Sequence, residues 1–211
     1  MHPASFISSF KRIVSILVLL ALVIAGVAFF GRALAVVDGP QKNGPFLQDD
    51  REYDVLFFGS SHMVNGVFPM VLWKDYGLTS YNLGGHGASI AASYWELRLA
   101  TQYHKPKVAV LDVLFAGSQV TEMELGLAHE LLDIYPLSRT KAEAVQDLFE
   151  ESGTRAEMLF PLDVYHNRWK ELDSGMVRRG LRGERTYSPE KGSQIRAGLY
   201  PLAQEPLVPE T

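Results

Sequence analysis

The feature that most constrains this chain is an uncharged apolar run near its N-terminus, Ile13–Gly31. Its length of about 19 residues is close to the roughly 20 needed to cross a hydrocarbon core of about 30 Å. Lys11 and Arg12 precede the run and only Arg32 follows closely. The positive-inside rule therefore favours a cytoplasmic N-terminus. We expect a single membrane-spanning helix with the remainder of the chain outside the cytoplasm.

Two other interpretations of the run stay open. Ala33-Leu34-Ala35 offers a small-x-small cleavage site, so the run could belong to a secretory signal, although such signals have a shorter apolar core of about 7 to 15 residues. It could also be a buried core helix. The anchor and the signal both place the following domain outside the cytoplasm.

The composition excludes several classes of function. The 211 residues are 47% hydrophobic and 21% charged, an ordinary globular balance, with a net charge of −4. No stretch gathers enough Lys and Arg for nucleic-acid binding, so we expect no nucleic-acid partner. The chain has no cysteine, which excludes disulfides, thiolate metal sites and cysteine nucleophiles.

Beyond the run, short apolar segments alternate with amphipathic ones, which is typical of parallel α/β folds. We expect a doubly wound (flavodoxin-like) parallel sheet. Three strands are few for a finished sheet, so we expect an incomplete domain, from a fragment or a shortened reading frame. The predicted strands are Asp54–Phe58, Thr79–Leu83 and Lys107–Val113, and the predicted helices are Val67–Tyr76, Ala88–Tyr103, Gln119–Leu132 and Ser138–Glu151.

These patterns divide the chain into five segments. A cytoplasmic N-terminus is followed by the anchor, a polar tether rich in Gly, Pro and Asp, the N-terminal part of the α/β domain, and an irregular tail. Their expected bounds are 1–12, 13–32, 33–52, 53–172 and 173–211.

Candidate site residues directly follow the predicted strands. Ser61 comes after the first strand, Gly84–Gly87 after the second, and Asp112 lies at the end of the third. Ligands of open α/β sheets bind outside the carboxyl ends of the strands, so we expect these residues to converge. A hydroxyl at Ser61 would be exposed there, close to backbone N–H groups able to receive a developing oxyanion.

Two sequence blocks resemble the SGNH (GDSL-like) hydrolase superfamily. The first is Gly59-Ser60-Ser61-His62 with Gly66, and the second is Asn82-Leu83-Gly84-Gly85-His86-Gly87. The resemblance implies that Ser61 is the nucleophile and that Gly84 donates an oxyanion-hole N–H, with Asn82 opening the second block. Ser60 departs from the usual Asp, and the Gly-x-Asn-Asp block after the third strand is absent, with Asp112 in that region.

More closely, the run from Asp54 to Val113 looks like the membrane-anchored DltD and AlgX/AlgJ groups. That likeness implies acyl modification of cell-envelope polymers, with a cell-envelope glycan or acylated polymer as substrate and a membrane-bound acyltransferase as a partner. It also implies a single-pass protein of a bacterial cell membrane.

The last superfamily block, Asp-x-x-His, supplies the base and the carboxylate that orients it. Asp163-Val164-Tyr165-His166 matches those letters, which makes Asp163 and His166 the candidate pair. The block normally follows a fifth strand, whereas His166 comes only about 105 residues after Ser61. We therefore prefer a mid-chain role for this segment, with the base pair beyond Thr211.

Each candidate also has a structural interpretation. Ser61 could be a helix N-cap or a polar turn residue, and His62 a solvated turn residue rather than a site group. Asp112 could cap a helix or loop, and Asp163 and His166 could belong to a surface helix turn.

The histidines show no metal-ligand spacing, so we expect neither a metal nor a cofactor. Two functions follow: a serine esterase or acyltransferase of SGNH type, or a non-catalytic binding or assembly subunit that keeps the scaffold.

Overall fold

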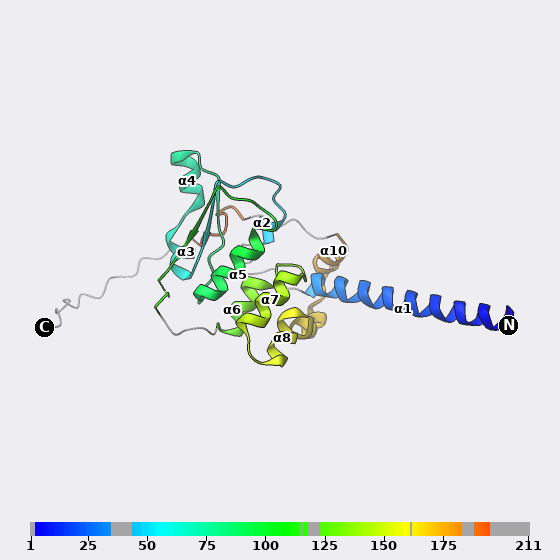
Figure 1. The fold of residues 1–211 in the computed structure, drawn as a ribbon. Helices are drawn as coiled ribbons and strands as arrows, with labels where there is room; N and C mark the ends of the chain where they lie inside the picture. The colour runs from blue at the N-terminus through cyan, green and yellow to red at the C-terminus, as the bar shows by residue number, and fades with distance from the viewer. Residues whose placement is uncertain are drawn as a thin grey trace.

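The structure, a computed structural model, is a mixed α/β arrangement around a small parallel sheet (Figure 1). It describes residues 3–34, 44–114, 116–117, 123–160, 162–182 and 188–194. Three parallel strands pair in the order β2-β1-β3, with Val55 opposite Ser80 on one side and Val108 on the other. The strands are β1 (Val55–Phe58), β2 (Ser80–Asn82) and β3 (Val108–Leu111).

The helices that join the strands begin and end at residues suited to those positions. They are α3 (Ser61–Gly66), α4 (Pro69–Tyr76) and α5 (Ile90–Ala100). Ser60 and Ser89 cap α3 and α5 with their hydroxyls, which satisfies backbone N–H groups that a helix leaves unpaired. Gly77 ends α4 in the left-handed region, with φ of 68°. The predicted alternation of strands and helices up to β3 is confirmed.

A second layer of helices follows β3. It contains α6 (Leu125–Leu132), α7 (Arg139–Leu148), α8 (Ser152–Leu159), α9 (Leu162–Tyr165), the 3-10 helix η1 (His166–Glu171) and α10 (Ser174–Arg182). Ser138 caps α7 as the sequence predicts, although that helix ends at Leu148. The helix α10 lies in the stretch expected to be irregular, and its structure depends on packing against a distant part of the chain.

One hydrophobic core lies against the sheet. Leu56 and Phe58 of β1 are fully buried there with Tyr81 of β2, and Phe46 of α2 (Gly44–Leu47) packs on Tyr53 and Tyr81. Residues 44–52 were expected to be tether, but Phe46 is 0% exposed and belongs to this core. Its apolar ring makes the later part of that stretch an integral part of the domain.

The other core joins the helices to one another. It lies among α5, α6, α7 and α8, where Leu99, Leu132, Val145 and Met158 are buried. The indole Nε1 of Trp95 in α5 also donates to Asp147 Oδ2 in α7 at 2.6 Å. The sheet and the second helical layer therefore share α5 as their common element.

The edge strand β3 is apolar yet exposed. Val108 is 52% exposed and Leu111 37%, and Val113 and Leu114 beyond the strand are exposed as well. The sequence predicts a strand here, and the described helices cover β1 but leave β3 open. An uncovered apolar edge is unusual, because it can pair with another strand.

The N-terminal helix α1 (Pro3–Leu34) projects from the domain (Figure 1). Its Lys11–Gly31 segment is long and apolar enough to cross a membrane, and none of its residues is fully buried. At its end, Ala33 and Leu34 are 0% and 2% exposed, because α9, η1 and α10 pack there. The last turn of α1 is thus part of the folded domain.

A short segment of the expected irregular tail docks on the sheet. The N–H of Asn82 in β2 donates to Lys191 O at 2.9 Å, and the N–H of Gln194 donates to Val64 O in α3. Residues 188–194 therefore cover the free edge of β2.

Candidate functional site

The candidate serine lies where β1 turns into α3, at the carboxyl end of the central strand. Ser61 is the first residue of α3, and its side chain is half-buried. Its hydroxyl makes no hydrogen bond with any described residue. The preceding Gly59 has a φ of 147° and lies so close to Asp112 that a Cβ would fall 2.4 Å from the Asp112 Cβ. Only glycine allows β1 and β3 to converge this closely.

The neighbouring Ser60 has a structural role. Its side chain is 2% exposed, accepts from the His62 N–H at 3.4 Å and donates to Asp112 Oδ2 at 2.7 Å. The His62 Nδ1 also lies 3.4 Å from the Ser60 hydroxyl. Ser60 thus joins the start of α3 to the end of β3, which an ionised carboxylate in its place could not do beside Asp112.

Asp112 is held as a carboxylate. Burial raises its pKa, but hydrogen bonds from the Leu114 N–H and from Ser60 outweigh burial, so its pKa lies below the ordinary value. The charge of His62 acts in the same direction. Asp112 therefore fixes the turn at the carboxyl edge and contributes negative charge close to His62.

The second block lies against the serine turn. A Cβ on Gly84 would come within 2.8 Å of the Met63 Cβ and 3.2 Å of Ser60 O, so this position also needs glycine. The Gly85 N–H donates to Gly59 O at 2.8 Å. The fold therefore brings together the two blocks, which lie about 20 residues apart in the chain.

The buried side chain of Asn82 links the serine turn to the glycine loop. It is fully buried, its Nδ2 donates to Met63 O at 2.6 Å and Val67 O at 2.9 Å, and its Oδ1 accepts from the Gly84 N–H at 3.1 Å. Asn82 therefore positions α3 and the glycine loop. In this arrangement the Gly84 N–H points to Asn82, and an oxyanion would have to compete with that oxygen.

The two histidines near the turn have different surroundings. His62 is exposed, whereas the His86 Nε2 lies 2.9 Å from Gln194 Oε1 in the docked segment. Neither forms a hydrogen bond with Ser61, and adjacent side chains such as those of Ser61 and His62 rarely reach one another.

The Asp163–His166 segment lies elsewhere. Asp163 falls in α9, and its side chain is outside the described part of the structure. His166 is exposed at the start of η1, which packs against α1, and Arg168 of η1 donates to Leu34 O at 2.6 Å. Figure 1 shows α8 and the end of α1 well away from α3. The structure does not bring His166 to Ser61.

A different His–Asp pair forms inside the helical layer. His129 and Asp133 of α6 are both largely buried, with Nδ1 2.9 Å from Oδ2, and Tyr165 of α9 donates to the same oxygen at 2.8 Å. The sequence signal was the four-residue spacing, which places both side chains on one helix face. This pair is turned toward α8 and α9, while Leu127 and Leu131 of the same helix face the glycine loop.

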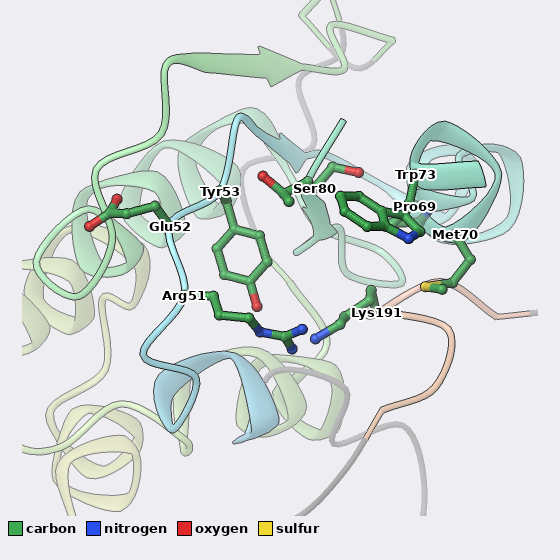
Figure 2. Close-up of a pocket in the computed structure, with 9 residues that line it drawn as sticks. Arg51, Glu52, Tyr53, Pro69, Met70, Trp73, Ser80 and Lys191 are labelled. Carbon is green, nitrogen blue, oxygen red and sulfur yellow. The ribbon is translucent and has the colours of Figure 1, made fainter. Parts of the chain in front are cut away.

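The structure also forms a pocket at the opposite, amino end of the strands (Figure 2). It has a volume of about 240 Å³, and Figure 2 shows Tyr53 and Trp73 on opposite sides with Ser80 between them. The Ser80 hydroxyl is buried and has no hydrogen-bond partner among the described residues. Arg51 and Lys191 close one end.

The carboxylate of Asp49 binds the two basic side chains of this pocket. It accepts from Arg51, from the Tyr53 hydroxyl at 2.7 Å and from Lys191 Nζ at 3.0 Å. The Arg51 guanidinium is the main reason that the pKa of Asp49 lies well below its usual range, against the opposing effect of burial. In the part of the chain that the structure describes, no three histidine or acidic side chains gather to hold a metal ion.

The chain matches no protein-family model, no curated protein and no solved structure. What the Ser61 turn does must therefore be inferred from its own geometry.

Proposed function

We propose that this chain is a membrane-anchored, extracytoplasmic SGNH-like protein of the acyl-ester hydrolase or acyltransferase type, acting on bacterial cell-envelope polymers. The observation that carries the proposal is the Ser61 turn. Its half-buried hydroxyl stands at the N-terminus of α3 and at the carboxyl end of the central strand, and the Gly84 loop packs directly against it. This is the position at which α/β sheets bind ligands.

The proposed chemistry is acyl transfer through Ser61. Its Oγ attacks the ester carbonyl, and the negative charge that develops on oxygen is stabilised by the backbone N–H of Ser61 and by that of Gly84 once it turns from Asn82 Oδ1. A general base takes the hydroxyl proton and returns it to the alcohol oxygen as the ester bond breaks, and water or a polymer hydroxyl then takes the acyl group from Ser61. His166 does not reach Ser61 in this arrangement, so we propose that the base is a histidine that these 211 residues do not supply.

We further propose a doubly wound sheet that continues past β3. The strand order β2-β1-β3 supports this, because β2 and β3 lie on opposite sides of β1. Right-handed crossovers from β1 to β2 and from β2 to β3 then place their connecting helices on opposite faces of the sheet. The open apolar edge of β3 supports the continuation, since another strand would cover Val108 and Leu111.

The proposed location is a bacterial cell membrane, with α1 retained as the anchor and the domain outside the cytoplasm. Burial of Ala33 and Leu34 against the domain supports retention. Cleavage after Ala35 would remove the helix on which α9, η1 and α10 pack.

The second candidate is a non-catalytic binding or assembly subunit, with an acylated polymer and a membrane-bound acyltransferase as its partners. Two observations favour it. No described histidine forms a hydrogen bond with Ser61, and the pocket that Trp73 and Tyr53 line together with charged and polar residues lies at the amino end of the strands, away from the serine. Aromatic faces with a few polar groups are typical of small-molecule and sugar sites.

Labelling with a fluorophosphonate probe separates the two candidates. We expect the full-length wild type in membranes to be labelled, Ser61→Ala to lose labelling, and His166→Ala to keep it, because η1 lies away from the serine. An unlabelled wild type would exclude the enzyme. Binding of envelope glycan that Trp73→Ala abolishes and Ser61→Ala leaves intact would then support the subunit.

A further inference from the structure

The helix α10 packs against the end of the apolar helix α1. A Cβ on Gly180 would fall 2.5 Å from the Phe29 Cε2 and 3.0 Å from the Ala33 Cβ. Gly180 therefore permits a close approach of the two helices. Since the candidate span ends at Gly31, α10 lies level with the last turn of that span.

The 3-10 helix η1 reaches the same end of α1 from another part of the chain. The guanidinium of Arg168 donates to Leu34 O at 2.6 Å, which pairs a carbonyl at the C-terminus of α1. Arg168 is also 3.2 Å from Glu171 within η1. Figure 1 shows α10 beside the end of α1 while the other end of that helix points away from the domain.

Several exposed residues of these two helices are of the kind found at membrane surfaces, although Glu171 of η1 is also exposed. Trp169 is 59% exposed in η1, and Leu181 is 70% exposed in α10. Lys170 and Arg178 are exposed beside them, and α10 contains no acidic residue. Indole rings favour the boundary between hydrocarbon and water, and basic side chains there attract lipid phosphates.

We propose that η1 and α10 form a membrane collar that rests in the phospholipid headgroup layer around the exit of α1. The occupant of this surface is the phosphate-bearing bilayer that α1 spans. Burial of residues 33 and 34 fixes the position of the collar along the axis of α1. If α1 moved along that axis relative to η1 and α10, the Arg168–Leu34 hydrogen bond and the Gly180–Phe29 packing would be lost.

The collar has a consequence for the candidate site. It holds the domain in one orientation, and in Figure 1 the helix α3 lies on the side of the sheet away from α1. Ser61 then faces the envelope rather than the bilayer. The collar depends on the proposed membrane anchor but is independent of any catalysis at Ser61.

Fluorescence quenching in vesicles tests the collar directly, because the chain has three tryptophans. Full-length protein carrying Trp73→Phe and Trp95→Phe keeps only Trp169, and the matched control carrying Trp95→Phe and Trp169→Phe keeps only Trp73. Both are reconstituted into vesicles of phosphatidylcholine and phosphatidylglycerol whose acyl chains are brominated near the headgroup, and flotation measures insertion.

We expect both variants to float with the vesicles and Trp169 alone to lose about half its fluorescence, because its indole lies at the interface. Replacing Lys170 and Arg178 by Glu should reduce that quenching. Flotation without quenching of Trp169 would overturn the collar and leave the anchor intact. Failure of both variants to float would overturn the anchor and the collar together, whatever the outcome of fluorophosphonate labelling.

Discussion

Ser60 and Ser61 are adjacent in the chain, yet their environments give them different roles. Ser60 is buried and joins α3 to Asp112, whereas the hydroxyl of Ser61 is bound by no described residue. The difference comes from the helix start, where the N-cap side chain turns back to the backbone and the next side chain points outward.

Removing the cap should destabilise the turn without touching the candidate nucleophile. We expect Ser60→Ala to lower the free energy of unfolding by about 2 kcal/mol, because α3 loses its cap and Asp112 loses a donor. Chemical denaturation of the full-length protein in detergent measures this. The control is Ser61→Ala, which should change stability by less than about 0.5 kcal/mol. Equal effects of the two substitutions would contradict the separate roles.

His129 is a second residue whose role depends on its partners. Burial lowers its pKa, but Asp133 at 2.9 Å and Glu157 at 3.5 Å outweigh burial, so the pKa in the folded protein lies above the ordinary 6.5. The folded state therefore favours the protonated imidazolium, which links α6 to α8.

The raised pKa makes stability depend on pH in a defined direction. The contribution of His129 is fully present below its unfolded pKa of about 6.5 and is lost as the pH rises through the higher folded value. We expect the melting temperature to fall between about pH 6 and pH 8 by more in the wild type than in His129→Gln. A slope that the substitution leaves unchanged would assign the pH dependence to other groups.

Among the elements, the docked segment 188–194 shows how a stretch without periodicity acquires a fixed place. Gly192 has a φ of 88°, and a Cβ there would fall on Asn82 O and the Tyr81 ring. The segment also satisfies the Asn82 N–H at the edge of β2. An edge covered in this way is protected from pairing with another chain.

Substitution of that glycine should release the segment. We expect Gly192→Ala to destabilise the protein by at least about 1 kcal/mol, since the residue is both strained and in steric conflict. Hydrogen exchange at the Asn82 amide should accelerate. The control is Gly126→Ala in α6, which has open space around it and should stabilise its helix slightly. Unchanged protection at Asn82 would show that the segment does not cover β2.

The three strands and the helices α4, α5, α6 and α7 could be predicted from the sequence, because each of them carries its own pattern, whereas the short helices α2 and α3 were not predicted. Ser138 and Gly77 mark helix ends through local hydrogen bonds and local φ. The burial of Phe46 could not be predicted, because the residue lies in a polar stretch of the sequence. Its ring is buried only because it packs on an aromatic cluster that includes the distant Tyr81.

For the whole molecule, the decisive feature is that α1 continues into the domain instead of ending before it. Ala33 and Leu34 are buried, and Arg168 pairs the carbonyl of Leu34. A peptidase would need these residues in an extended, accessible form. The helix and its contacts therefore oppose cleavage at the Ala33-Leu34-Ala35 site.

Retention of the anchor is directly measurable. We expect intact mass spectrometry of protein extracted from membranes to show that residues before 36 are present. Arg168→Ala should increase proteolysis between α1 and the domain. Without the guanidinium the carbonyl of Leu34 loses its hydrogen bond, and the last turn of α1 unwinds more often. A mature N-terminus at residue 36 would instead identify the run as a cleaved signal.

The sequence by itself determined the features that depend on residues close together in the chain. These are the membrane-compatible length of α1, the alternation of strands and helices, and the serine turn before α3. Tertiary structure alone decided that Ser60 is held by Asp112, that His129 and Asp133 are buried against α8 and α9, and that α10 lies beside α1. The physical reason is that periodicity and capping act over a few residues, whereas the choice of partner depends on packing between segments far apart in the chain.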